Sequence, residues 1–244
     1  MLYLIGLGLG DEKDITVNGL ERVKKCYKIY LESYTSKLQC SVSSLEKFYG
    51  KKIIIADRGL VEKKAEDTIL KDALKEKVAF LVIGDVFSAT THVDLYQRAL
   101  EKGIAVEVVN NASILAAVGI VGLELYKYGR VISIPFNNKD VKSPVEFFNV
   151  NFKNNLHSLF LLDLDPMHGR FMGIKEGIDY LTARGVDENL LGIGCSGLGS
   201  KGFEIKAGKL KELKKHKFTK YPQCLIMPAE KMHFMEEDMV KKWL

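Results

Sequence analysis

The run from Val78 to Gly84, VAFLVIG, is apolar at every position before its closing glycine, and few folds accept such a strand. A strand with one face in water alternates apolar and polar residues, whereas a strand buried on both faces does not. Continuous apolar strands are typical of parallel sheets that helices cover on both sides. The sequence therefore predicts an α/β fold built on a largely parallel sheet.

Short strands and helices alternate around this run. The expected strands cover residues 2–7, 27–33, 51–57, 78–84 and 104–109, and the expected helices follow Asp14 or Thr16 and then cover 43–50, 61–75 and 90–102. Ser43 to Glu46 has the pattern of a capping box, and the helix over 61–75 is strongly amphipathic. This regularity predicts five strand–helix units in one layer.

The pattern changes after residue 110. Helices are expected over 112–128, 144–155, 173–184 and 229–243, and strands over 130–136, 158–164, 190–195 and 224–227. We therefore expect two α/β domains, an N-terminal one over residues 1–110 and a C-terminal one over residues 111–244. Clefts between such domains commonly hold ligands.

Composition excludes several classes of protein. With 47% hydrophobic and 27% charged residues, the chain can bury a substantial core, which argues against disorder. The longest apolar stretch, Ile114–Leu123, is too short to span a bilayer, and the N-terminus has no basic leader. The cysteines, Cys26, Cys40, Cys195 and Cys224, lack C-x-x-C spacing, which favours a reducing compartment. We expect a soluble, cytoplasmic protein.

The formal net charge of +5 is too small to indicate nucleic-acid binding by itself. The charge is unevenly placed, because residues 201–220 contain eight lysines against two acids, Glu204 and Glu212. Such a segment is either a solvated surface ribbon or a docking surface for an acidic partner, and the sequence leaves both open.

A glycine-rich loop, Gly6-Leu7-Gly8-Leu9-Gly10, follows the first strand of the N-terminal domain. Glycines at this place let the backbone approach a ligand closely, although a tight turn alone also explains them. The third glycine comes one position early for a dinucleotide fingerprint. Because Glu32 lies where an acid would bind a ribose, a nicotinamide-dependent oxidoreductase stays a possible alternative.

Two further polar segments follow strands at the predicted carboxyl edge of the sheet. Asp85 comes directly after the central strand, where it either contacts a ligand or caps the next helix. His92 has no partner by spacing and is expected to pack or cap. The segment Asn110–Ile114 either holds a polar ligand group or forms an ordinary helix cap.

The remaining candidate motifs do not indicate a binding site. The segment from Gly192 to Gly199 is rich in glycine but lacks the GxxxxGK[ST] spacing, which excludes an NTPase phosphate loop. The histidines His157, His168, His216 and His233 do not form pairs at metal-ligand spacing, so the sequence predicts no metal site.

Five segments in fixed order carry a resemblance to a known family. They are MLYLIGLGLGDEKDITVNGLE, LESYTS, GDVFSATTHVDL, NNASI and SPVEFF. With them the chain resembles the diphthine synthases, methyltransferases of diphthamide biosynthesis with a tetrapyrrole-methylase-like fold. The resemblance covers residues 1 to about 163. Beyond Asp163 it thins, and the region between LLDL and LLGIG is shorter than in most relatives.

The resemblance implies a homodimer that binds S-adenosylmethionine between two α/β domains and leaves S-adenosylhomocysteine as product. The implied substrate is the modified histidine of translation elongation factor 2, whose amine, and in eukaryotic relatives a carboxylate, is methylated. From the residues themselves we expect no metal, no membrane and no direct nucleic-acid partner. The implied cofactor contacts are Leu9, Asp85, Ser88, Ser113, Ile114, Leu162, Leu198 and Gln223.

Three positions depart from the family's pattern. Val86 and Ser88 stand where the family's GDPFGATTH has proline and glycine, and Gln223 stands where a histidine is usual. Contacts through backbone atoms survive such changes, whereas side-chain contacts need not. The resemblance assigns no catalytic acid or base, because a sulfonium methyl group is already a strong electrophile and needs mainly positioning. A non-enzymatic translation-factor-binding protein that uses the lysines of residues 201–220 is the second alternative.

Overall fold

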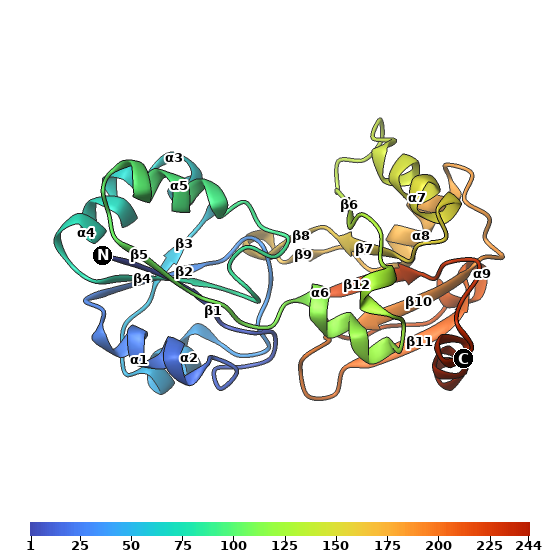
Figure 1. Cartoon of the computed structure of the whole chain (residues 1–244), viewed down its shortest axis with the longest axis horizontal. Helices are drawn as coiled ribbons and strands as arrows, with labels where there is room; N and C mark the ends of the chain where they lie inside the picture. Colours follow the sequence, from blue (N-terminus) through green and yellow to red (C-terminus); the bar gives the residue numbers. More distant parts are fainter. The chain divides into compact units, whose positions relative to one another are not determined.

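The computed structural model describes residues 1–244, which fold into two compact units, Met1–Leu115 and Ala116–Leu244 (Figure 1). Each unit contains its own five-stranded sheet. The predicted boundary after residue 110 falls in the segment that follows the last strand of the first unit.

The first unit is built on a parallel sheet. Its strands are β1 (Leu2–Gly6), β2 (Lys28–Glu32), β3 (Ile54–Ala56), β4 (Val78–Val82) and β5 (Val106–Val109). Their order is β3-β2-β4-β1-β5, and every neighbouring pair runs parallel. The apolar run that begins at Val78 is the central strand β4, and all of its residues are buried. The predicted parallel α/β sheet is confirmed.

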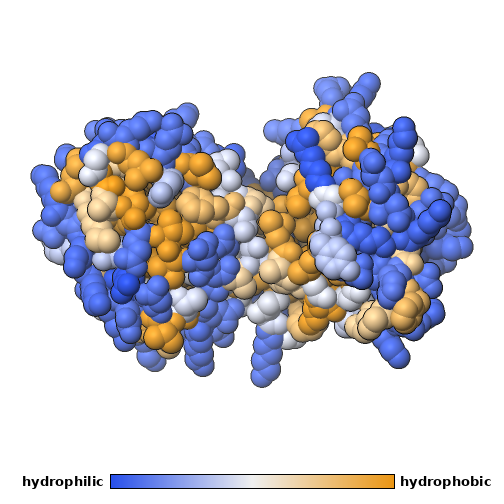
Figure 2. Space-filling view, viewed as in Figure 1, coloured by the Kyte–Doolittle hydropathy of each residue, from blue (hydrophilic) through white to orange (hydrophobic).

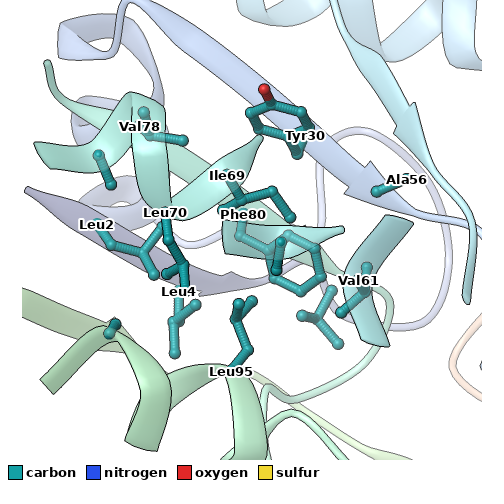
Figure 3. Close-up of a cluster of buried hydrophobic side chains, with 14 of the residues drawn as sticks. Leu2, Leu4, Tyr30, Ala56, Val61, Ile69, Leu70, Val78, Phe80 and Leu95 are labelled. Carbon is teal, nitrogen blue, oxygen red and sulfur yellow. The ribbon is translucent and has the colours of Figure 1, made fainter. Parts of the chain in front are cut away.

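Helices cover both faces of this sheet. One face carries α1 (Val17–Lys25) and α2 (Val42–Tyr49), and the other carries α3 (Arg58–Lys63), α4 (Ile69–Lys75) and α5 (Val93–Glu101) (Figure 1). Successive side chains of a strand point to opposite faces. Leu4 therefore joins the core under α3, α4 and α5, which Figure 3 shows around Phe80, while Ile5 joins the core under α1 and α2.

The expected helix over 61–75 is wrong, because α3 and α4 are separate helices with a 3-10 turn over Ala65–Asp67 between them. The hydroxyl of Thr68 donates to the Lys64 carbonyl at 2.6 Å. A continuous helix would offer that carbonyl to the Thr68 N–H, which bonds to the Ala65 carbonyl instead. A side-chain hydroxyl thus competes with the helix for its own backbone acceptor.

The structure shows which residues cap the first two helices. Thr16, and not Asp14, caps α1, because its hydroxyl accepts from the Gly19 N–H at 3.0 Å. The capping box predicted from Ser43 is wrong, since Ser41 caps α2 from outside that box. Gly50 ends α2 as expected, with a left-handed φ of 68°.

The second unit is built on a mixed sheet. Its strands are β6 (Ile132–Ile134), β7 (Ser158–Leu162), β10 (Leu191–Ser196), β11 (Glu204–Lys209) and β12 (Gln223–Met227). Their order is β11-β10-β12-β7-β6, with β6 parallel to β7 and the other pairs antiparallel. The sequence did not predict β11, or the hairpin of β8 (Leu164–Asp165) and β9 (Arg170–Phe171) that follows β7.

The helices of the second unit are α6 (Ile114–Ala117, which begins in the first unit), α7 (Ser143–Lys153), α8 (Ile174–Thr182), α9 (Leu210–Leu213) and α10 (Phe234–Val240). The expected helix over 112–128 is wrong, because α6 ends early and two 3-10 turns follow. Gly122 interrupts it with a φ of 93°, and a Cβ there would lie 2.4 Å from the Met239 Cβ. The expected helix over 229–243 begins only at Phe234, because His233 caps α10.

On the face seen in Figure 2, hydrophilic residues cover most of the rim of each unit, and apolar residues form smaller patches. No helix combines the length and the apolar composition that a membrane span requires.

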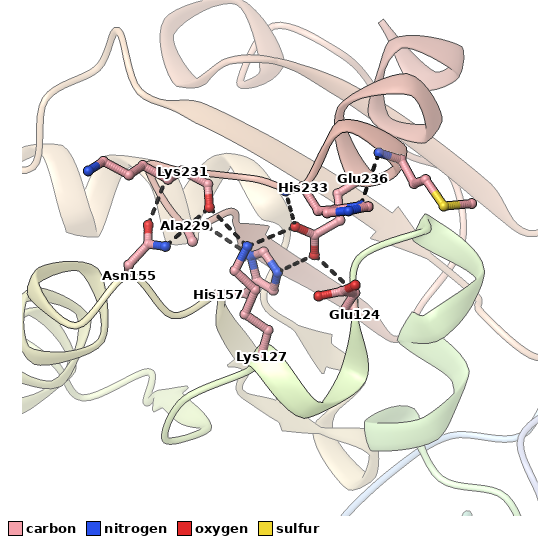
Figure 4. A network of polar contacts seen from close by, with 9 residues as sticks. Glu124, Lys127, Asn155, His157, Ala229, Lys231, His233 and Glu236 are labelled. Carbon is pink, nitrogen blue, oxygen red and sulfur yellow. Dashed lines mark hydrogen bonds and ion pairs between the residues drawn. The ribbon is translucent and has the colours of Figure 1, made fainter.

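A buried polar network joins distant segments of the second unit (Figure 4). The Glu236 Oε1 atom accepts from His157 Nε2 at 2.7 Å and from the Glu124 N–H at 2.9 Å. Its Oε2 atom accepts from Lys127 Nζ at 2.9 Å and from the His233 N–H at 2.8 Å. His157 Nδ1 accepts from the Ala229 N–H, so the ring is neutral and donates through Nε2. Burial alone would raise the pKa of Glu236, but these four donors lower it to about 2.

This network predicts acid sensitivity. A carboxylate whose folded-state pKa is depressed adds stability above its unfolded pKa, near 4.5, and loses it as pH falls toward about 2. Burial likewise lowers the pKa of His157 below 6.5, so its contribution declines in the same direction. We expect the urea-unfolding free energy to fall from pH 6.5 to 3, and to fall less in Glu236→Gln. Parallel pH profiles for parent and variant would contradict this assignment.

Candidate functional site

A polar site lies at one edge of the first sheet, where β1, β4 and β5 end. These strands are neighbours, so the loops that follow them, residues 7–16, 83–92 and 110–113, meet at their carboxyl ends. Open α/β sheets bind ligands at this edge. Five predicted cofactor contacts lie in these loops or at the start of α6: Leu9, Asp85, Ser88, Ser113 and Ile114.

The glycine-rich loop is shaped by its packing against the other two loops. A Cβ on Gly6 would lie 2.7 Å from the Gly84 carbonyl and 2.9 Å from the Asn111 Cβ. Gly8 and Gly84 exchange backbone hydrogen bonds of 3.1 and 2.8 Å, and both have positive φ. The glycines therefore allow the three loops to approach one another, which is a structural requirement even without a ligand.

Asp85 joins the loops after β4 and β5. The residue is 8% exposed. Oδ1 accepts from the Phe87 N–H at 3.1 Å and the Ser88 hydroxyl at 3.0 Å. Oδ2 accepts from Asn110 Nδ2 at 2.9 Å and the Asn111 N–H at 3.2 Å. Burial would raise the pKa of Asp85, but these donors hold it below its usual value, so the carboxylate is ionised at neutral pH.

Asp85 does not cap the following helix. That helix, α5, begins at Val93, and its N-terminus has no side-chain cap bond. The capping alternative is therefore wrong, and the ligand contact of Asp85 stays a prediction.

Asn111 is a site residue that the sequence did not single out for a role. Its Nδ2 donates to the carbonyls of Gly6 and Asp14, both at 3.0 Å, and its Oδ1 accepts from the Ala112 N–H at 2.7 Å. One side chain thus ties the loop after β5 to both ends of the loop after β1. The available signal was its place after a parallel strand, but sequence spacing does not reveal its partners.

The other predicted contacts present apolar surface and hydroxyl groups. Leu9 and Ile114 are partly exposed, and Leu9 Cδ2 lies 3.8 Å from where a Cβ on Gly84 would be. The Ser88 hydroxyl donates to Asp85 and keeps lone pairs that can accept. The Ser113 hydroxyl accepts from the Leu115 N–H at 3.2 Å and keeps its proton to donate.

Glu32 is fully buried and fully engaged. Its Oε2 accepts from the backbone N–H groups of Tyr34 and Thr35 at 3.1 and 3.0 Å. Its Oε1 accepts from the Thr35 hydroxyl at 2.6 Å and from the Ile83 N–H at 3.4 Å. The carboxylate therefore has no free edge for ribose hydroxyls, which removes the residue on which the nicotinamide alternative depended.

His92 packs behind the same site, as the sequence predicts. The ring is buried, its Nδ1 lies 3.3 Å from the Val86 carbonyl, and its Nε2 lies 3.3 Å from the Tyr34 hydroxyl. Burial lowers the pKa of His92, which favours the neutral ring that donates to Val86 and accepts from Tyr34. His92 therefore positions the loop after β4.

The remaining predicted contacts belong to the second unit. Leu162 ends β7 and is 6% exposed, and its Cδ2 lies 2.8 Å from where a Cβ on Gly177 would be. Leu198 is buried in the loop after β10. Gln223 begins β12; its Oε1 accepts from the Ile174 N–H and its Nε2 donates to the Lys220 carbonyl, both at 2.9 Å. The Gln223 amide is thus used internally, and cofactor contact by these three residues stays a prediction.

The charges of the loops in the first unit favour a cationic ligand. They carry the carboxylates Asp11, Glu12, Asp14 and Asp85 against one lysine, Lys13. This balance repels phosphate groups and attracts positive charge. The apolar Leu9 and Ile114 and the hydroxyls of Ser88 and Ser113 lie at the same edge of the sheet. No cluster of three His, Cys, Asp or Glu side chains could hold a metal ion.

Comparisons with known proteins identify a family and several relatives of this chain. The family model described as Tetrapyrrole (Corrin/Porphyrin) Methylases matches residues 1–214. Diphthine methyl ester synthase 2 of Candida albicans is 44% identical over 97% of this chain and 87% of its own length. Diphthine methyl ester synthase of Homo sapiens is 42% identical over 98% of this chain and 94% of its own. A crystal structure of diphthine synthase superposes with a TM-score of 0.93 at 32% identity, over 99% of this chain and 95% of that one.

Proposed function

Because this chain belongs to the tetrapyrrole (corrin/porphyrin) methylase family and is a methyltransferase of the diphthine synthase type, we propose that it uses S-adenosylmethionine to methylate the modified histidine of translation elongation factor 2. The proposed acceptors are the amine and a carboxylate of that residue. One observation carries the proposal: relatives named diphthine methyl ester synthase align with nearly the whole chain at 42–44% identity. A protein that only binds the translation factor would not require a methylase domain.

The first unit supplies the residues that would hold the donor. Leu9 and Ile114 offer apolar contact, and the hydroxyls of Ser88 and Ser113 offer hydrogen bonds. The ionised Asp85 and its acidic neighbours supply a negative potential for a positive sulfur. When bound, S-adenosylmethionine supplies a methyl group that needs no further activation. The task of the protein is then to position the acceptor and to exclude water.

The acceptor amine attacks only when neutral, because an ammonium group has no free lone pair. Bulk water can take the ammonium proton before attack, so the reaction does not require a buried base. The absence of an assigned acid–base pair is therefore compatible with the proposal. We also propose a cytoplasmic protein and, from the resemblance, a homodimer in which Leu162, Leu198 and Gln223 complete the cofactor contacts.

We expect the purified protein to bind S-adenosylhomocysteine in calorimetry with a Kd near or below about 10 μM, or roughly 7 kcal/mol of binding free energy. Binding should persist in EDTA, because the proposed contacts include no metal. NAD should give no heat under the same conditions, because Glu32 is unavailable to a ribose. Binding of NAD together with no binding of S-adenosylhomocysteine would overturn the assignment of the donor.

The activity itself is tested with translation elongation factor 2 that carries the unmethylated intermediate. We expect its mass to rise by whole methyl groups when S-adenosylmethionine and the enzyme are both present. No mass change in the presence of bound donor would refute the proposed substrate.

A further inference from the structure

The positive charge of the protein is concentrated in one segment. Residues 201–220, here called the lysine segment, contain eight lysines and two acids and so carry +6. The whole chain carries +5 with neutral histidines. All the other residues together therefore carry only −1.

The lysine segment lies along one edge of the second sheet. It contains β11, which pairs with β10 on one side only and is the edge strand of its sheet. It continues into α9, where Leu210 and Leu213 are buried and Lys211 and Glu212 are not. The buried leucines fix the helix to the sheet, so that the charged residues are directed away from the core.

Acidic side chains neutralise little of this charge. Glu204 pairs with His216 at 2.5 Å, and Lys214 pairs with Asp179 at 3.4 Å. Seven lysines have no carboxylate within salt-bridge distance: Lys201, Lys206, Lys209, Lys211, Lys215, Lys217 and Lys220, whose ammonium group donates to the Lys201 carbonyl. Uncompensated like charges on one edge repel one another, and a partner of opposite charge relieves that repulsion.

The residue types favour an acidic protein over a nucleic acid. The lysine segment contains no arginine, the side chain that forms paired hydrogen bonds with phosphates. Its aromatic residues are few: Phe203 is 38% exposed, and Phe218 packs against the His216 ring at 4.7 Å. Recognition of single-stranded RNA depends on exposed aromatic platforms. Flexible lysines are suited to long-range attraction of surface carboxylates.

We propose that the lysine segment is the docking surface for an acidic face of the protein substrate. It accelerates the encounter between enzyme and substrate and does not contribute to binding of the methyl donor. The inference rests on the proposed function, because it assumes that the substrate is a protein. An edge strand also gains protection against aggregation from lysines, so the test must separate docking from such protection.

The test compares two charge-reversed variants. The surface variant carries Lys209→Glu, Lys215→Glu and Lys217→Glu, three exposed lysines of the lysine segment. The control variant carries Lys24→Glu, Lys63→Glu and Lys71→Glu, three exposed lysines of the first unit that also lack a salt bridge. Each reversal removes two charges, so both variants move the net charge from +5 to −1. They differ only in where the charge is changed.

We expect the surface variant to lose about tenfold or more in kcat/KM for the translation factor at low ionic strength. The loss should shrink to about twofold at high salt, where charges are screened. The control variant should stay within about twofold of the parent throughout. Calorimetry should give all three proteins the same affinity for S-adenosylhomocysteine.

Three results would overturn the docking surface. They are an unchanged kcat/KM of the surface variant, an equal loss in the control variant, and a surface variant that only aggregates more or only loses affinity for single-stranded RNA. If the parent itself transfers no methyl group, the proposed function fails. Fluorescence anisotropy can then measure how tightly the translation factor binds to the parent, the surface variant and the control variant. This measurement tests the docking surface without depending on methyl transfer.

Discussion

Replacing Asp85 with asparagine should lower the affinity for S-adenosylhomocysteine by about tenfold to a hundredfold. The carboxylate accepts four hydrogen bonds, two at each oxygen, from the loops after β4 and β5. An amide turns one of these oxygens into an NH₂ group that faces two donors. A hydrogen bond to a charged group is worth about 1.5–3 kcal/mol, and because these bonds hold the two loops in the arrangement proposed to bind the donor, the loss of one should appear as this loss of affinity. The substitution also removes negative charge from a site that favours a cation.

The matched control for this experiment is Asp72→Asn in the same unit. Asp72 accepts from Lys28 Nζ at 2.8 Å and from the Tyr30 hydroxyl at 2.6 Å. Lys28 begins β2, so this group lies at the opposite edge of the sheet from the site. We expect the control to lower stability and to leave the affinity unchanged. If Asp85→Asn binds within about twofold of the parent, the carboxylate does not organise the donor site.

Replacing Glu236 with alanine should lower the free energy of unfolding by about 3–5 kcal/mol, the usual cost of breaking a buried ion pair. The side chain is 1% exposed and accepts from His157 and Lys127. Alanine leaves the buried His157 Nε2–H without its acceptor, removes the carboxylate that pairs with Lys127, and removes the acceptor of two backbone N–H groups. Urea denaturation measures the change, as a lower midpoint with little change in slope.

The neighbouring Glu237 provides the matched control on the same helix. It is exposed, and Glu237→Ala should change the free energy of unfolding by no more than about 0.5 kcal/mol. If Glu236→Ala does not yield folded protein, Glu236→Gln retains the size and one acceptor and should give a smaller loss. A loss for Glu236→Gln no greater than that of Glu237→Ala would show that the network contributes nothing.

The sequence predicted the first sheet because its signals are local. Each strand is a short apolar run, and the fully apolar β4 can only lie at the centre of a sheet covered on both faces. The sequence did not predict the two helix interruptions, because each depends on a single contact and not on a local pattern. The Thr68 hydroxyl takes the Lys64 carbonyl, and Gly122 lies against Met239, a partner far along the chain.

The second sheet was predicted less well for a similar reason. The strand β11 carries Lys206 and Lys209 on an exposed edge, so it lacks the apolar pattern that identifies a strand. It forms because β10 offers it an unpaired antiparallel edge. Such pairing depends on a neighbour and cannot be read from the composition of the strand itself.

The candidate site also combines features that the sequence predicts with features that depend on tertiary contacts. The sequence by itself determined that Asp85 and Asn111 follow parallel strands, which places them at the ligand-binding edge of the sheet. Only the tertiary structure decided that Asp85 accepts from the Asn110–Asn111 segment and does not cap α5, that Glu32 is fully occupied, and that Gly6 is required by a neighbouring loop. The physical reason is that strand and helix patterns depend on nearby residues, whereas hydrogen-bond partners are set by the distances between loops that only folding brings together.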